Sequence, residues 1–500
     1  MTASPFSILI IVVPLISSFL IILAGWFRKS FCYPFMLAAL SFSAFSSLIL
    51  LQEVIRHGTL HYHLGNWKPP WGIEYVIDHL NAFVAVVVSV ISLLIGISSK
   101  RMVERALPKR LAYFYCLFLL QVTGLLGIVI TGDVFNLYVF LEIASLAGYV
   151  LIAIGEEGAP FASFNYMIYG TIGACFYLLS IGYLYIVTGS LNMADLSKLL
   201  LPLYHSKVVL MAFAFFIVGV AIKMALFPLH VWLPDAYTYA PSSVTALVAP
   251  LMTKVAAYVL IRMMYTVFEP NFSRELIPVA PILSWVSFCA ILFGCIWALG
   301  QRDLKRMLAY VLIAEVGYIT LGVGLGNHNG LIGAILHIMN DALMMACLFL
   351  VVGAISYKGW SRRIDQFKGL HRKMPLTMAA FVISALSVIG IPPTCGFFSK
   401  WYLVLGAIEA GQWFFVAVLL VSSLLNAILF FKVIEGAYFE PVTDEDPIQP
   451  LEKKSMTLSE EAPPSILIPT ILLAIGILSV GLLSGTIISE VIRFALPKNF

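Results

Sequence analysis

Several ionisable side chains of this sequence stand in the middle of long apolar stretches. Lys223 and His230 lie within VGVAIKMALFPLHVWLPDA at 218–236. The other residues of this kind are Glu142, Lys254, Glu315, His337, Asp341, Lys400 and Lys432. A charge at the bilayer centre costs ~2.5–3.5 kcal/mol on insertion scales, so such residues usually face the interior of a helix bundle and mark ion or proton pathways. We therefore expect these residues to translocate protons.

These residue types suit a proton relay. In a low dielectric the pKa of a lysine falls from ~10.4 toward neutrality, and a neighbouring carboxylate raises it again. Moving the carboxylate therefore switches the lysine between holding and releasing a proton. Histidine, with an unperturbed pKa of ~6.5, can pass protons between lysines. Lys223 and His230 are seven residues apart, and an unbroken helix would place both on one face.

Some of these residues have a second interpretation. A single intramembrane histidine can simply form a hydrogen bond to a neighbouring helix. Lys432 can lie near a helix end and extend its charge to the interface. The histidines of HGTLHYH at 57–63 suggest a metal site, but this extramembrane segment contains no acidic or cysteine ligand. We therefore expect no metal there.

The elements that must position these residues are membrane helices. Of the 500 residues 61% are hydrophobic and 11% charged, which indicates a polytopic membrane protein. A helix needs ~20 apolar residues to cross the hydrocarbon core. About fourteen runs meet this need, near 5–27, 33–54, 76–99, 112–130, 133–154, 161–187, 207–233, 243–267, 276–299, 307–325, 328–356, 374–410, 412–438 and 465–494. The alternating segments of a barrel are not visible, so the prediction is all-α.

Two of these runs are interrupted by prolines, one at Pro228 and Pro234 and the other at Pro392 and Pro393. A proline removes an intrahelical hydrogen bond and bends or breaks the helix. Broken backbone at membrane depth persists only where protein or a water-filled cavity satisfies it. Paired broken helices in two halves point to inverted repeats with a transport path between them. The alternative is that each kink only serves packing.

The spacing of the charges suggests a repeat. Glu142 and Glu315 are 173 residues apart (142 to 315), Lys223 and Lys400 are 177 apart (223 to 400), and Lys254 and Lys432 are 178 apart (254 to 432). This predicts two five-helix repeats at 112–267 and 276–438, unless the offsets coincide by chance. The remaining parts are three helices within 1–111, a polar linker at 439–464 and a C-terminal helix within 465–500.

No cofactor is expected in this chain. Its seven cysteines form no C-x-x-C pair, whereas zinc and iron–sulfur sites need more closely spaced ligands. We expect those inside predicted helices to be small buried hydrophobes, namely Cys116, Cys175, Cys289, Cys295 and Cys347. Neither a dinucleotide fingerprint nor a P-loop occurs. The chain therefore has no catalytic chemistry of its own, and nucleic acid is not expected as a partner.

Basic residues gather after the odd-numbered predicted helices. They are Arg28 and Lys29; Lys100, Arg101, Arg105, Lys109 and Arg110; Arg302, Lys305 and Arg306; and Arg362, Arg363, Lys368, Arg372 and Lys373. By the positive-inside rule, these segments face the cytoplasm and both termini lie on the opposite side of the plasma membrane. The first run lacks a preceding basic residue and a convincing cleavage site, so we expect it to be a retained helix.

The motifs that surround these charges resemble a known family. KMALFPLHVWLPDAYTYAPSSVTALVAPLMTK, with FNLYVFLE before it and IGIPPTCGFFSKW after it, is similar to the antiporter-like subunits of Mrp-type sodium/proton antiporters, respiratory complex I and membrane-bound hydrogenases. The resemblance covers about 76–438. In length and layout the chain looks most like the D-type Mrp subunit and its hydrogenase counterpart.

The resemblance implies fourteen helices, with two inverted five-helix repeats and broken seventh and twelfth helices. It also implies roles for single residues. Glu142 and Lys223 would form the charge pair of the first half-channel. Lys254 and His230 would lie on a central polar axis, and Lys400 would be the terminal proton carrier.

One segment departs from the family pattern. Many relatives have N-H-A-x-x-K in the eleventh helix, whereas this chain has NDALMM, with Asp341 and Met345 at the two altered places. His337 lies one turn earlier. The central relay would then run through His337 alone, or through water at an interruption. Glu315 stands where relatives commonly have an uncharged polar residue or histidine, which would give the second half its own carboxylate–lysine pair.

The prediction is therefore a proton-translocating subunit that works with other membrane subunits in the lipid bilayer. Work would come from outside the chain, either from a sodium gradient, with Na⁺ as the second ion, or from a redox complex. Two alternatives stay open. One is a self-sufficient secondary transporter of a small solute, which broken helices and repeats also fit. The other is a structural subunit with vestigial channels, suggested by Asp341 and Met345.

Overall fold

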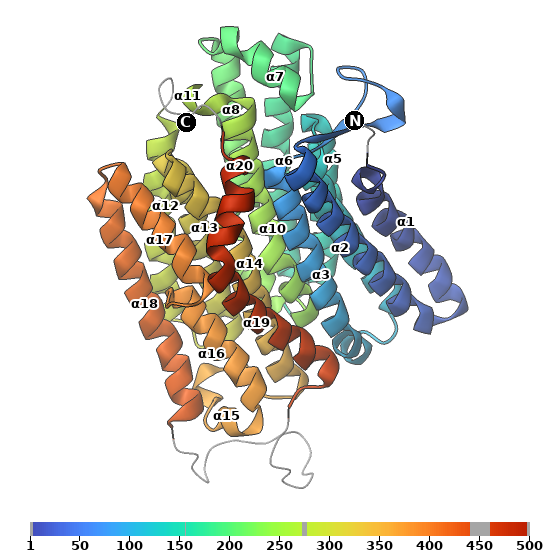
Figure 1. The fold of residues 1–500 in the computed structure, drawn as a ribbon. Coiled ribbons are helices and arrows are strands. Elements are labelled where there is room, and N and C mark those ends of the chain that lie inside the picture. Colours follow the sequence, from blue (N-terminus) through green and yellow to red (C-terminus); the bar gives the residue numbers. More distant parts are fainter. Residues whose placement is uncertain (1–3, 156, 273–277, 441–460, 498–500) are drawn as a thin grey trace.

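The computed structural model describes residues 4–155, 157–272, 278–440 and 461–497, and they form an elongated bundle of helices (Figure 1). Twelve of the helices in these ranges are long and apolar enough to cross a membrane. They are α1 (Phe6–Phe27), α2 (Cys32–His57), α3 (His79–Ala106), α4 (Leu111–Ile130), α5 (Val134–Ala153), α6 (Ala159–Thr188), α10 (Ser242–Arg262), α12 (Val279–Leu299), α13 (Leu304–Leu325), α14 (His328–Tyr357), α18 (Trp413–Tyr438) and α19 (Pro464–Ile487).

The two remaining predicted spans are divided at the prolines, as expected. α8 (Lys207–Lys223) is followed after a break by α9 (Leu233–Tyr239), and α16 (Pro375–Ile389) by α17 (Cys395–Glu409). A helix end leaves carbonyl groups without intrahelical partners. Side chains satisfy some of them, because Trp232 Nε1 donates to Ile222 O at 3.2 Å and Lys400 Nζ donates to Val388 O at 2.6 Å. The predicted membrane fold, mostly helical and with two broken helices, is thus confirmed.

Short elements lie outside the long helices. β1 (Leu60–His63) pairs antiparallel with β2 (Glu74–Ile77). The short helices are α7 (Met193–Leu200), α11 (Glu269–Asn271), α15 (Leu370–Lys373) and α20 (Arg493–Ala495). The hairpin places His61 Nδ1 2.7 Å from Glu74 Oε1. The sequence interpretation that no acidic group accompanies these histidines was wrong, because strand pairing supplies one from a distant position.

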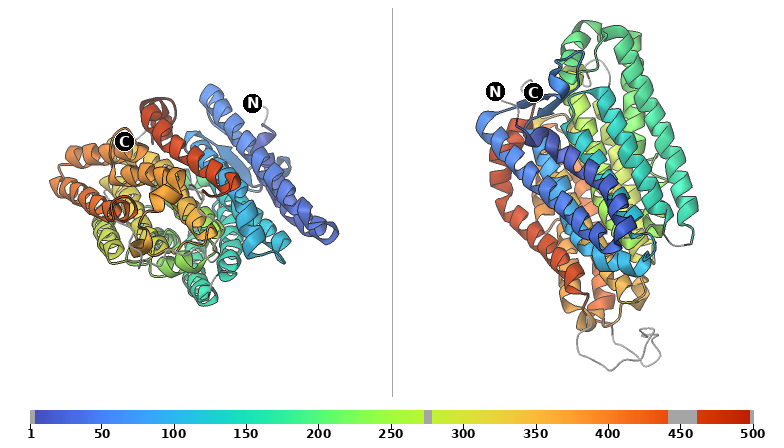
Figure 2. Two further views of the ribbon diagram at one scale, coloured as in Figure 1. Left: turned by 90° about the horizontal axis from the view of Figure 1, so that it is seen from below. Right: turned by 90° about the vertical axis from the view of Figure 1, so that its right-hand side faces the viewer.

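The centre of the bundle is formed by α10, α13 and α14, whose residues are almost all buried. A helix that is apolar all round belongs in the interior. α19 crosses the bundle obliquely against α3, α14, α16 and α17 (Figures 1 and 2). Most of the charged residues singled out above therefore lie on the innermost helices or on helices packed directly against them.

The basic segments and the termini lie at opposite ends of the bundle. Figure 1 shows the N- and C-terminal ends in the upper part, on opposite sides of the view, and α15 at the bottom. At that lower end, Leu304 N donates to Arg362 O at 2.9 Å, and the Arg105 guanidinium donates to Tyr357 O. Three of the four predicted basic segments thus meet at one end. Most of the predicted 439–464 linker lies outside the described residues.

The cysteines follow the position of their helices in the bundle. Cys116, Cys295 and Cys347 are buried and Cys289 is half-buried. Cys175 is exposed, so the prediction of burial was wrong for this residue. It lies on α6, an outer helix whose other exposed side chains include Ile172 and Leu179.

Candidate functional site

The first charged pair lies where α8 ends. Lys223 is the last residue of α8, and its Nζ is 3.6 Å from Glu142 Oε1 and donates to Ser145 Oγ at 2.8 Å. The lysine side chain is 3% exposed and that of Glu142 is 25% exposed. The resemblance implied the pairing with Glu142, and the structure places the two side chains together. Ser145 was missed, although its position three residues after Glu142 puts both on one face of α5.

The second pair joins the two predicted halves. Lys254 Nζ of α10 lies 2.5 Å from Asp341 Oδ2 of α14, and both side chains are buried. From the sequence it stayed open whether Asp341 interrupts the central relay, and in the structure this carboxylate directly contacts the lysine of the first half. Met345, one turn further along α14, is also buried. A buried ion pair of this kind depends on both members, since either charge alone would be left uncompensated.

The third pair is Glu315 and His337. Glu315 Oε2 lies 3.0 Å from His337 Nε2, and neither side chain is exposed. On the other side of the ring, His337 Nδ1 is 2.8 Å from Ser399 Oγ, whose hydroxyl donates to Gly396 O at 3.2 Å. When the hydroxyl donates to Gly396 O, the neutral tautomer that fits has Nδ1 donating to Oγ. A lone pair on Nε2 would then face the carboxylate, so the two groups are placed to share a proton.

Lys400 follows the second broken helix. Besides donating to Val388 O, its Nζ lies 3.5 Å from the Tyr318 hydroxyl and 4.4 Å from the centroid of the Tyr318 ring. The expected Glu315–Lys400 pair is therefore replaced by a contact with Tyr318, because Glu315 contacts His337 instead. Tyr318 and His337 are in edge contact, with ring centroids 5.4 Å apart. Tyr318 was missed, although it lies three residues after Glu315 on α13.

Two predicted members lie apart from this row. His230 is buried between Phe227 and Phe293, with ring centroids at 5.4 Å and 4.9 Å, and its Nδ1 has no hydrogen-bond partner among the described residues. The break takes His230 out of α8, so its spacing from Lys223 no longer fixes a shared face. Lys432 is exposed on α18, which agrees with the interfacial alternative and not with a buried charge.

A gap separates the first two pairs. A cavity lies between Lys223 and α10, the helix that carries Lys254. Apart from Lys223, its lining is apolar and consists of Leu125, Ile128, Leu141, Val220, Met252, Val255, Ala256 and Val259. A proton that passes from Lys223 to Lys254 would therefore need water in this space, because the lining supplies no other ionisable group.

A further ion pair lies at the far end of α10. Asp78, the N-cap of α3, accepts two hydrogen bonds from Arg262, at 2.6 Å and 2.8 Å. Burial alone would raise the pKa of the Asp78 carboxyl, but the Arg262 guanidinium and the backbone N–H of Asn81 hold it below its usual range. The pair was not predicted. The D-x-x-N spacing at 78–81, which forms a capping box, was the available signal.

Comparisons with known proteins identify a matching family and several related chains. Residues 131–426 match the family described as NADH:quinone oxidoreductase/Mrp antiporter, TM. The chain is 48% identical to NADH-quinone oxidoreductase subunit N of Desulforudis audaxviator over 493 residues, 98% of each protein. It is 32% identical to the D-type subunit of the Na⁺/H⁺ antiporter of Alkalihalophilus pseudofirmus over 396 residues, 79% of each.

A solved structure also resembles the structure of this chain. A chain of the membrane-bound sulfane sulfur reductase, an archaeal respiratory membrane complex, has a TM-score of 0.88 and 30% identity, with 98% of this chain and 97% of that chain covered.

Proposed function

Because this chain belongs to the NADH:quinone oxidoreductase/Mrp antiporter transmembrane family, we propose that it moves protons as one membrane subunit of a multisubunit complex. The observation that carries the proposal is the row of buried groups that starts at Glu142 and Lys223, continues through Lys254 and Asp341 and through Glu315 and His337, and ends at Lys400.

In this proposal, each step changes the partner of a buried charge. Lys223 takes up a proton from one side while Glu142 stabilises its charge, and water in the apolar gap passes the proton to Lys254. Asp341 and His337 are one helical turn apart on α14, so they can relay the proton toward Glu315. Lys400 releases it on the other side. An unpaired charge in a low-dielectric environment has a high free energy. Each proton movement that leaves a charge unpaired therefore favours the next movement, which restores a partner.

The driving force comes from partner subunits. The relative with 48% identity is a subunit of an NADH-quinone oxidoreductase, which supports a redox-driven complex. The similarity to a component of an Na⁺/H⁺ antiporter supports a second candidate, in which a sodium gradient drives proton exchange. These relatives do not support a solitary transporter. The contact between Lys254 and Asp341 also supports a proton-carrying centre over a vestigial channel.

Identification of the subunits that co-purify with the native complex distinguishes the two driving forces. We expect iron–sulfur or nickel–iron subunits if redox chemistry drives the complex, and only small hydrophobic subunits if a sodium gradient does. Recovery of an active chain without any partner would contradict both candidates.

The orientation and the repeats belong to the same proposal. We place both termini on the non-cytoplasmic side of the plasma membrane, supported by the gathering of basic segments at the opposite end. We also propose that 112–267 and 276–438 are related five-helix units. The support is that Lys223 ends α8 at one break and Lys400 lies in α17 just after the other.

Proton flux through the reconstituted native complex tests the proposed role. We expect Lys223→Ala to abolish proton transport while the complex still assembles, because the first carrier is lost. Lys432→Ala is the matched control, since this lysine also lies on a membrane helix but is exposed; it should transport like the wild type. Unchanged flux in assembled Lys223→Ala would remove the proposed role.

A further inference from the structure

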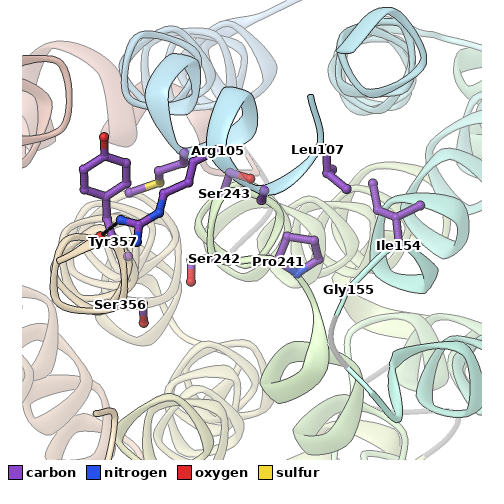
Figure 3. Close-up of a pocket in the computed structure, with 12 residues that line it drawn as sticks. Arg105, Leu107, Ile154, Gly155, Pro241, Ser242, Ser243, Ser356 and Tyr357 are labelled. Atoms are coloured by element: carbon purple, nitrogen blue, oxygen red, sulfur yellow. Dashed lines mark hydrogen bonds between the residues drawn. The ribbon is translucent and has the colours of Figure 1, made fainter. Parts of the chain in front are cut away.

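A cavity opens at the basic end of the bundle, among the ends of α3, α5 and α14 and the beginning of α10. It encloses about 1010 Å³, open mouth included. Figure 3 shows Arg105 and Tyr357 on one side, Leu107 and Ile154 on the other, and Ser242 between them. None of the described residues that line it is acidic. The cavity therefore combines a cationic wall with an apolar one.

The beginning of α10 supplies free hydrogen-bond donors. Val244 N and Thr245 N both bond to Pro241 O at 2.9 Å, and no side chain caps this helix. Within the described chain, the backbone N–H groups of Ser242 and Ser243 bond to no acceptor. The first turn of a helix carries such unsatisfied N–H groups together with a partial positive charge, which favours an anion.

A buried hydroxyl adds independent support. Ser243 lines the cavity and is only 4% exposed. Ser356 Oγ, also in the lining, is a buried atom that has no hydrogen-bond partner among the described residues. Buried polar groups are normally hydrogen-bonded. The Ser356 hydroxyl therefore indicates a polar ligand.

Arg105 provides the positive charge that would attract an anionic ligand. Its guanidinium donates to Tyr357 O and lies 5.2 Å from the centroid of the Tyr357 ring. Arginine has five N–H donors in a planar fork that matches the geometry of a phosphate. One contact to Tyr357 leaves other donors for a ligand, so the position of the guanidinium is fixed while its binding capacity is retained.

The apolar wall continues into a groove on the outside of the bundle. Ile154 lines both the cavity and this groove, which is bounded by α1, α4 and α5. The other apolar side chains of the groove include Ile22, Leu117 and Val150, and Arg110 lies in the same lining. Val150 is 48% exposed, so the groove faces outward. A free phosphate ion would leave this apolar surface unused, whereas a lipid tail would cover it.

We propose that this cavity binds an anionic phospholipid. Its phosphate would lie between Arg105 and the beginning of α10, and one acyl chain would occupy the groove beside Ile154. Part of the cavity lining comes from α10 and α14, the helices that hold Lys254 and Asp341. The lipid therefore joins the ends of two helices whose middle parts form the central ion pair.

Native mass spectrometry of the delipidated complex, titrated with phosphatidylglycerol, phosphatidylethanolamine or inorganic phosphate, tests the proposal. We expect phosphatidylglycerol to bind more tightly than phosphatidylethanolamine. Arg105→Gln should weaken this binding by about tenfold, the effect of one lost charge-assisted hydrogen bond. Lys109→Gln is the control, because Lys109 is exposed four residues after Arg105 but does not line the cavity; it should bind like the wild type.

Two further variants separate a lipid from a free ion. Ile154→Trp fills the passage to the groove and should reduce lipid binding without changing the binding of inorganic phosphate. Ser243→Leu fills the polar end of the cavity and should also weaken the binding of phosphatidylglycerol. This variant tests the proposal if Arg105→Gln fails to assemble. The proposal is overturned if phosphatidylglycerol does not bind, if Arg105→Gln and Lys109→Gln have equal effects, or if inorganic phosphate binds and Ile154→Trp leaves lipid binding unchanged.

Discussion

At the scale of single residues, Tyr318 is the group that the sequence did not reveal and the geometry makes central. Its ring contacts His337 on one side and lies under Lys400 Nζ on the other, and its hydroxyl accepts from Lys400 Nζ at 3.5 Å and from Asn426 Nδ2 at 3.4 Å. The ring can hold the cation by a cation–π interaction. The hydroxyl can in addition pass a proton, which a phenyl ring cannot.

Tyr318→Phe separates these two roles. The ring and its contact with Lys400 are kept, while loss of the hydroxyl should lower proton flux by about tenfold, equivalent to ~1.4 kcal/mol in the barrier. The free energy of unfolding should fall by only ~1 kcal/mol, because Asn426 Nδ2 loses one hydrogen-bond acceptor. Tyr402→Phe, half-buried on α17, is the control and should change neither quantity. Wild-type flux in Tyr318→Phe would show that the hydroxyl has only a structural role.

At the scale of elements, α10 carries three polar residues spaced along its length. Ser242 begins it at the basic end, Lys254 contacts α14 at mid-membrane, and Arg262 contacts Asp78 at the opposite end. Lys254 and Arg262 are buried, so each must be satisfied by a neighbouring element. The position of α10 is therefore fixed by α3 at one end and by α14 in the middle.

The pair of Asp78 and Arg262 predicts a pH dependence of stability. Asp78 has a lowered pKa in the folded state, so its contribution is present above the unfolded pKa of ~3.9 and is lost as the pH falls through the folded value. Asp78→Asn should lower the free energy of unfolding by about 3 kcal/mol at neutral pH, because Arg262 stays buried without its partner.

Thermal unfolding of the purified complex as a function of pH measures this effect. The difference between wild type and Asp78→Asn should shrink as the pH falls below ~3.9. Asp365→Asn serves as the control, since the ion pair of Asp365 with Arg363 is exposed and contributes little. A difference that does not change with pH would mean that the Asp78 charge is not what stabilises this end of α10.

The central ion pair allows stability to be separated from transport. Lys254→Met alone should destabilise the chain by ~3–5 kcal/mol, because Asp341 is left buried and unpaired. The double variant Lys254→Met with Asp341→Leu replaces both charges by apolar groups and should recover most of that loss. Equal thermal stability of the single and double variants would contradict the close buried contact.

At the scale of the whole molecule, local sequence signals predicted the helices and the breaks but not how the charges pair. Apolar runs located the spans, and prolines located both breaks. The pairing of Lys254 with Asp341 depends on the packing of α10 against α14. The spacing of residues along a single helix does not reveal such a contact between helices. For the same reason Glu315 was assigned to Lys400 and not to His337. His230 was assigned to a central polar axis, and in the structure its ring contacts Phe227 and Phe293. Short-range spacing could have found Ser145 and Tyr318.

The central claim is that protons cross between the two halves through Lys254 and Asp341. Proton flux in proteoliposomes of the complex that carries Lys254→Met with Asp341→Leu measures this most directly, because this variant should assemble and remain stable. We predict that flux is lost while the complex stays intact. Wild-type flux in the assembled double variant would contradict the claim.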